Sequence, residues 1–98
     1  MIQTPRMPME IKYGTRFRKN YKEADRHIKT AFEQTLELFF YQQDHPSLRN
    51  HALRGKFVGY RSINVTDDVR AIFKVTQTGK KTIIIFHMLG THEQLYKK

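Results

Sequence analysis

The C-terminal segment carries a histidine placed for acid–base chemistry. Thr91 and Gln94 have the spacing of a capping box, so a short helical turn is expected to start there, with His92 as its first residue. Tyr96 follows His92 by four residues and therefore shares its face of the turn. A neutral imidazole in this position can act as a base near neutral pH. The alternative interpretation is that His92 only caps or forms the turn.

Two other side chains, Arg70 and His51, suit chemistry on a phosphate. Arg70 stands in an otherwise apolar stretch, where its guanidinium can bind a phosphate oxygen in two-pronged fashion or simply face solvent. His51 offers a second imidazole, although a lone loop histidine also has a purely structural interpretation. Asp68 is most simply a turn-former. Neither the histidines nor the acids show the spacing of a zinc site, so the sequence predicts no metal.

Between His45 and Thr66 the chain has cations and rings but no acidic residue. The cations of this segment are Arg49, Arg54, Lys56 and Arg61, interleaved with His45, His51, Phe57 and Tyr60. Such a mixture suits the binding of a nucleic acid with stackable bases, because cations hold phosphates and rings take bases. The alternative is a solvated loop whose aromatic residues belong to the core.

The overall charge favours a polyanionic partner. Eighteen Lys and Arg against nine Asp and Glu give a formal net charge of +9. Nucleic acid, the ribosome, an acidic protein and an anionic membrane surface all fit that charge.

Composition excludes several other classes. The 98 residues are 39% apolar and contain no cysteine, which suits one domain over residues 1–98 and excludes disulfides and a thiol nucleophile. The longest strongly apolar run, residues 83–86, is far shorter than the roughly 20 residues that span a bilayer. Residues 1–6 lack the apolar stretch of a signal peptide, so we expect a cytoplasmic protein. No phosphate-binding glycine loop, GxSxG or HExxH motif occurs.

The first half of the chain predicts helices. We expect residues 1–9 to form an irregular arm and residues 10–13 a short strand. Residues 15–43 contain no Pro or Gly and carry apolar residues at steps of three and four. One unbroken helix would be about 40 Å long, so we expect a break near residues 24–26, with Asp25 as N-cap of the second helix. That helix should end before Pro46.

The second half predicts strands at residues 57–65, 69–76 and 82–89, joined by turns at 66–68 and 77–80. The last run is apolar on both faces and therefore central. The expected fold is α+β: two N-terminal helices packed on one face of a small antiparallel sheet. The other face should be open and should display Arg70 and Lys74.

Four segments, taken in order, resemble the RelE/ParE toxin superfamily, and most closely its YafQ-like branch. These segments are NHALRG (residues 50–55), GYRSI (59–63), DVRAIF (68–73), and GTH with LY (90–92 and 95–96). The resemblance implies a RelE-like fold and a ribosome-dependent endoribonuclease, an mRNA interferase toxin of a type II toxin–antitoxin module. It implies attack by the 2′-hydroxyl with no metal or cofactor. The implied partners are a cognate antitoxin, mRNA and the ribosome.

The resemblance also implies roles for individual residues. His51 and His92 match the histidines of the branch, and Asp68 matches its acidic position. Tyr96 matches an aromatic residue near the C-terminus, and Arg70 an arginine of other branches. We expect Arg49, Arg54, Lys56, Arg61 and Lys74 to bind RNA.

Three positions depart from the YafQ-like pattern. Asn64 replaces a further histidine, Val69 a tryptophan, and Met88 an arginine. The loss of that arginine keeps two alternatives open: a ParE-type inhibitor of DNA gyrase, or a catalytically degenerate toxin that only binds an antitoxin.

Overall fold

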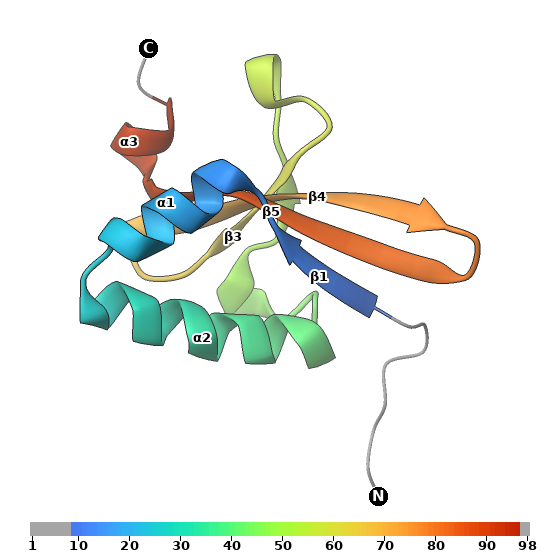
Figure 1. Cartoon of the computed structure of the whole chain (residues 1–98), viewed down its shortest axis with the longest axis horizontal. Helices are drawn as coiled ribbons and strands as arrows, with labels where there is room; N and C mark the ends of the chain where they lie inside the picture. The colour runs from blue at the N-terminus through green and yellow to red at the C-terminus, as the bar shows by residue number, and fades with distance from the viewer. Residues whose placement is uncertain (1–8, 97–98) are drawn as a thin grey trace, which may run out of the picture.

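The computed structural model describes residues 9–96 as a five-stranded sheet with helices packed against it (Figure 1). The strands are β1 (Met9–Tyr13), β2 (His51–Ala52), β3 (Arg61–Asn64), β4 (Val69–Thr78) and β5 (Lys81–Thr91). The helices are α1 (Thr15–Glu23), α2 (Arg26–Tyr41) and α3 (His92–Tyr96), with 3-10 turns η1 (Pro46–Leu48) and η2 (Gly55–Phe57). The predicted arm, residues 1–9, lies outside the described residues except for Met9, which begins β1.

The sheet has the order β1-β5-β4-β3-β2. The predicted antiparallel meander is present as β3, β4 and β5, and β5 lies between β4 and β1. The β1 strand runs parallel to β5, with Met9 beside Thr82 and Tyr13 beside Phe86. Sequence patterns did not predict this pairing or the two-residue strand β2, which is too short to show a period.

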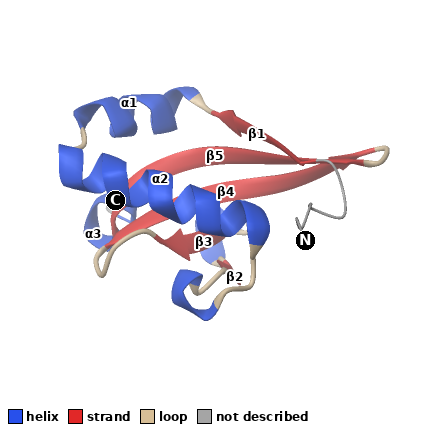
Figure 2. Cartoon of the chain, turned by 90° about the horizontal axis from the view of Figure 1, so that it is seen from below, coloured by secondary structure: helices blue, strands red, loops and turns tan. Residues whose placement is uncertain are grey.

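Both N-terminal helices cover one face of the sheet, here called the helix face (Figure 2). Phe17 of α1 and Phe32 and Phe39 of α2 are buried against it. Their ring centroids lie 5.6, 5.3 and 6.1 Å from the centroid of Phe86 on β5. These three residues belong to the apolar stripe that the helical periodicity predicted, and the stripe faces the core. Phe86 is the centre of the aromatic core.

The break between α1 and α2 lies where the sequence predicted it. Asp25 is the N-cap of α2, and its side chain accepts a hydrogen bond from the Ile28 backbone N–H at 2.9 Å. This bond satisfies one of the backbone donors that a helix start leaves without a partner.

Replacing Asp25 with alanine is expected to lower the free energy of unfolding by about 1 kcal/mol, because the freed N–H at the start of α2 loses its acceptor. Urea denaturation followed by circular dichroism measures this change. Glu37→Ala, at an exposed position on the same helix, is the matched control and should stay within about 0.5 kcal/mol of the wild type. Equal stability of the wild type and Asp25→Ala would contradict the capping role.

The predicted strand at residues 57–65 is wrong in its first half. Residues 55–57 form η2, and only Arg61–Asn64 are extended. Gly55 and Gly59 have φ angles of +66° and +93°, a left-handed backbone that glycine adopts without strain and that interrupts a strand. The segment therefore folds as a loop above the sheet before β3 begins.

The opposite face of the sheet, here called the second face, is less open than predicted. It carries Arg70, Ile72 and Lys74 of β4, which alternate with the helix-face residues of that strand. Ile72 and Met88 are fully buried under Leu95 of α3 and side chains of the η2 loop. Two apolar side chains at the centre of this face require that cover, so only its margins display charge.

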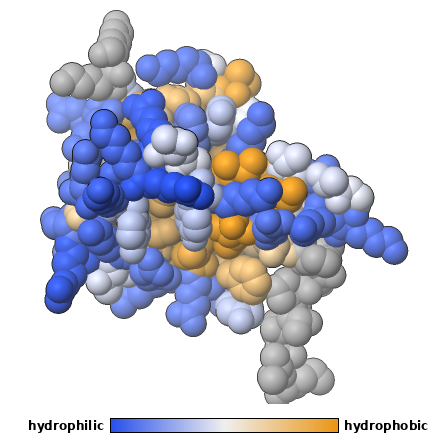
Figure 3. Space-filling model, viewed as in Figure 1, coloured by the Kyte–Doolittle hydropathy of each residue, from blue (hydrophilic) through white to orange (hydrophobic). Residues whose placement is uncertain are grey.

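The molecular surface is hydrophilic over most of the face seen in Figure 3, with an apolar band where β1 and β5 lie. Among the described residues, the only ion pairs join Glu10 to Lys81 at 2.7 Å and to Lys12 at 3.8 Å. The basic charge of the other elements is therefore not compensated by close acidic side chains. No described helix is long and apolar enough to cross a membrane.

Candidate active site

The predicted capping box forms and fixes the start of α3. The Gln94 backbone N–H donates to the Thr91 hydroxyl at 3.1 Å, and the Thr91 N–H donates to the Gln94 side-chain oxygen at 2.9 Å. The His92 N–H donates to the Asp68 carbonyl at 3.3 Å, which ties α3 to the turn before β4. His92 is thus held at the sheet end by bonds on both sides of it.

Replacing Thr91 with alanine is expected to release the start of α3 and to cost about 1 kcal/mol of stability, since one of the two reciprocal bonds is lost. Thr91→Ser keeps the hydroxyl and serves as the control. Thermal unfolding measures the stability, and amide hydrogen exchange at residues 92–96 measures the local opening of α3. Unchanged exchange in Thr91→Ala would show that the capping box does not hold the helix.

Tyr96 packs directly on His92. Their ring centroids are 4.5 Å apart with the planes tilted by 44°. Burial raises the pKa of the Tyr96 phenol, and the nearby positive charge of Arg70 lowers it by a smaller amount. The phenol therefore stays protonated at neutral pH and can donate a hydrogen bond. His92, Glu93, Gln94 and Tyr96 line a hollow of about 560 Å³ beside this pair.

The Arg70 guanidinium is held against the same turn. Its Nη1 donates to the backbone carbonyls of Thr66 at 3.0 Å and Val69 at 3.2 Å. These bonds use one nitrogen of a fork with five N–H donors, so the others remain available to a phosphate. The side chain is half-buried, and Asn64 lies beside it in the sheet register.

His51 lies on the second face as well, two strands away from β4. It pairs with Ser62, which pairs with Ile72, and residues paired across strands project to the same side. Two strand spacings place the His51 backbone about 10 Å from that of Ile72. The His51 Nδ1 lies 2.7 Å from the Arg49 carbonyl, which can only accept, so Nδ1 is the donor in this contact and Nε2 is the ring nitrogen left for a ligand.

The structure therefore brings His92, Tyr96, Arg70 and the Asp68 backbone together at one end of the sheet. His51 shares their face at a greater distance. The Asp68 side chain is exposed, and only its backbone carbonyl has a described role.

The predicted RNA-binding cations divide between the two faces. Lys74 and Lys56 stand over the rings of Tyr60 and Phe57, at 5.7 and 5.4 Å from the ring centroids. Arg49 and Arg54 are exposed on the loops around β2. Arg61 differs, because it pairs with the helix-face residue Phe73.

The Arg61 side chain serves its own loop. Its Nε donates to the Asn50 side-chain oxygen at 2.8 Å, and the Asn50 amide donates to the Gln43 carbonyl after α2. The structure thus does not bring Arg61 to the Arg70–His92 cluster.

Met88 stands where the resemblance implies an arginine, and its apolar side chain is fully buried. His87, beside it, was not singled out from the sequence. The register shifts between Ile72 and Phe73, which pair with Met88 and Phe86, so His87 is an extra residue in β5. Such a bulge depends on how β5 pairs with β4, so the local sequence around His87 does not predict it.

The two N-terminal helices on a five-stranded sheet form the α+β fold expected of RelE-like toxins. The family model "Bacterial toxin of type II toxin-antitoxin system, YafQ" matches residues 9–97, and the chain therefore belongs to the YafQ toxin family. No curated protein matches the chain.

Solved structures agree with this assignment. The crystal structure of YafQ from E. coli strain BL21(DE3) is 26% identical, with a TM-score of 0.68, and the match covers 90% of this chain and 98% of that one. YafQ in the E. coli DinJ–YafQ toxin–antitoxin complex is 25% identical, with a TM-score of 0.69 and coverage of 92% and 99%. A YoeB/ParE toxin from Agrobacterium tumefaciens shares the fold at 15% identity, with a TM-score of 0.70 and coverage of 86% and 99%.

Proposed function

We propose that this toxin is an endoribonuclease that cleaves mRNA on the ribosome, in the cytoplasm, without a metal or cofactor. The observation that carries the proposal is the cluster of His92, Tyr96 and Arg70 at one end of the sheet, with uncompensated cations around it. Imidazole, phenol and guanidinium supply the proton transfer and the charge stabilisation that cleavage of a phosphodiester by its own 2′-hydroxyl requires.

In the proposed reaction one imidazole removes the proton of the 2′-hydroxyl, whose oxygen attacks the adjacent phosphorus. The P–O5′ bond breaks, and an acid protonates the leaving 5′-oxygen. The products are a 2′,3′-cyclic phosphate and a 5′-hydroxyl. His92 is one member of the acid–base pair, and the family resemblance implies His51, which lies farther away on the same face, as the other, with the order of the two unassigned.

Arg70 stabilises the negative phosphorane through the N–H donors that the turn carbonyls leave free. Tyr96 keeps His92 in place, and its phenol can donate a hydrogen bond to the RNA. Asp68 orients a histidine or the ribose. Lys74, Lys56, Arg54 and Arg49 hold flanking phosphates of mRNA and ribosomal RNA.

We further propose a cognate antitoxin as the partner that keeps the toxin inactive. The similar E. coli toxin YafQ forms a complex with DinJ. An acidic or amphipathic antitoxin segment would cover the basic margin of the second face.

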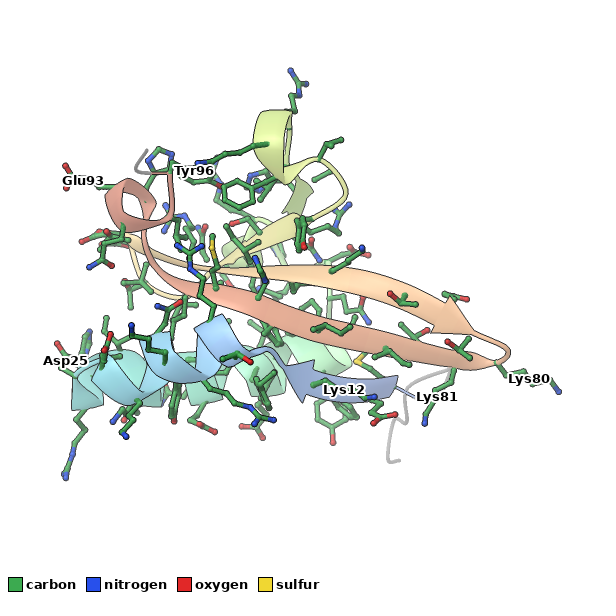
Figure 4. All side chains as sticks on the ribbon, turned by 45° about the horizontal axis from the view of Figure 1, so that its top comes forward. Lys12, Asp25, Lys80, Lys81, Glu93 and Tyr96 are labelled. Atoms are coloured by element: carbon green, nitrogen blue, oxygen red, sulfur yellow. The ribbon has the colours of Figure 1, made fainter. Side chains whose placement is uncertain are left out.

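The test is cleavage of a defined mRNA in a purified translation reaction, with the cut ends mapped. We expect the wild type to cut ribosome-bound mRNA and the double variant His92→Ala/Arg70→Ala to leave it intact. Lys80→Ala removes a cation at the hairpin tip, far from Tyr96 (Figure 4), and should cut like the wild type. Cleavage by the double variant at the wild-type rate would overturn the assignment.

The burial of Met88 favours a second candidate, a ParE-type inhibitor of DNA gyrase that needs no catalytic cation. Expression in bacteria separates the two. Loss of translation with cut mRNA supports the nuclease, whereas DNA damage with intact mRNA supports the gyrase inhibitor. Absence of any growth defect would indicate a degenerate toxin that only binds its antitoxin.

A further inference from the structure

Five rings form a continuous row on the second face. From His92 to Tyr96 the centroids are 4.5 Å apart, and from Tyr96 to Phe57 5.5 Å. Phe57 and Tyr60 are 6.3 Å apart, and Tyr60 and His87 5.1 Å. The row therefore leads from the candidate cleavage site across the face to β5.

The row joins three separate parts of the chain. His92 and Tyr96 belong to α3, Phe57 and Tyr60 to the segment of residues 55–60 that begins with η2, and His87 to the bulge of β5. Without the extra residue in β5, regular alternation would place the neighbours of Met88 on the helix face. The bulge thus brings His87 to the same side as Met88, where it reaches Tyr60.

The rings are only partly used by the core. Phe57, Tyr60, His87 and Tyr96 are half-buried, and His92 is exposed. Ile72, Met88 and Leu95 fill the space beneath Phe57, Tyr60 and Tyr96. The outer side of the row is therefore accessible to a ligand.

Cations accompany the row. The Lys56 and Lys74 ammonium groups stand over Phe57 and Tyr60, and the Arg70 charge acts on Tyr96. None of these three cations forms an ion pair among the described residues. Aromatic rings with cations close beside them are the arrangement that binds single-stranded nucleic acid, with bases on the rings and phosphates on the cations once the flexible lysine side chains turn toward them.

We propose that Tyr60 and His87, with Lys74, form a nucleobase-binding subsite for the RNA strand that passes through the cleavage site. This inference rests on the proposed nuclease function and gives it a specificity determinant outside the residues that cut. Burial lowers the pKa of His87, with a smaller effect from the charge of Arg16. The ring is therefore neutral at neutral pH and offers both a donor and an acceptor to a base edge.

The experiment measures binding separately from cleavage. The probe is a fluorescent 12-nucleotide single-stranded RNA with 2′-O-methyl groups, which lacks the attacking hydroxyl and cannot be cut. Fluorescence anisotropy gives its Kd. We expect His87→Ala to weaken binding about tenfold, within the range measured for loss of one stacked base.

Two matched controls accompany the variants. His27→Ala removes an exposed histidine on α2, and Lys80→Ala removes a cation of the hairpin tip. Both should change Kd less than twofold. Lys74→Ala should weaken binding and reduce the salt dependence by about one phosphate contact. Thermal unfolding shows whether His87→Ala is folded. If it is not, Lys74→Ala still tests the proposal, because Lys74 is exposed and its loss should leave the fold intact.

An abasic oligonucleotide of equal charge separates base from backbone recognition. The wild type should bind the normal oligonucleotide more tightly than the abasic one, and His87→Ala should remove that difference. If His87→Ala weakens binding of the normal and the abasic oligonucleotide equally, His87 contacts the sugar–phosphate backbone and the nucleobase subsite is wrong.

A poly-glutamate peptide tests an acidic protein as the occupant of this face. If the His87 and Lys74 variants bind the peptide more weakly than the wild type does but bind the RNA probe with unchanged Kd, the proposal is wrong. If the wild type never cuts mRNA but His87→Ala shows the base-dependent loss, the subsite stands and the nuclease assignment falls.

Discussion

Replacing His92 with glutamine is expected to lower the rate of mRNA cleavage by about 10²–10⁴-fold, the range that one positioned acid or base contributes. Glutamine keeps a polar side chain at the first position of α3 but cannot exchange a proton near neutral pH. The measurement is the single-turnover rate on ribosome-bound mRNA. Binding of the uncleavable RNA should change little, since the loss belongs to the chemical step.

The control for this variant is His27→Gln, the same chemical change at an exposed position on α2. It should cleave at the wild-type rate. A His92→Gln enzyme as fast as the control would remove His92 from the mechanism, whatever the role of Arg70.

Replacing Phe86 with alanine is expected to lower the free energy of unfolding by about 3–5 kcal/mol. Phe86 is fully buried and packs against rings from β1, α1, α2 and β4. Alanine leaves a cavity in place of the ring, and the surrounding strands and helices cannot move close enough together to fill it. Because small domains have a total stability of about 5–15 kcal/mol, the variant should be close to unfolding at 37 °C.

Urea denaturation measures the effect of Phe86→Ala. Val58→Ala is the control, because Val58 is 73% exposed and its loss should stay within about 0.5 kcal/mol. A cost below about 1 kcal/mol for Phe86→Ala would show that the core repacks and that Phe86 is not its centre.

Features set by local sequence were predictable. The Asp25 cap, the helix end before Pro46 and the Thr91–Gln94 capping box each depend on side chains a few residues apart. The α+β class and the strands of the meander follow from changes of hydrophobic period. The pairing of His92 with Tyr96 follows from helical spacing alone.

Features set by partners distant in the sequence were not predictable. The position of β1 beside β5, the cover over Ile72 and Met88, and the bulge at His87 depend on the assembled sheet. The direction of Arg61 depends on its register with Phe73. The candidate site residues were predicted from their chemistry and the family resemblance, whereas the row of rings beside them required the tertiary structure.

The parallel pairing of β1 with β5 has a consequence for biosynthesis. Met9 lies beside Thr82, and the Asn20 side chain accepts a hydrogen bond from the Leu89 backbone 69 residues later. Contacts of such separation form only after both segments have left the translating ribosome, and they close a long loop. The nascent polypeptide therefore cannot complete its sheet, or bring Arg70 together with His92 and Tyr96, until synthesis has passed α3.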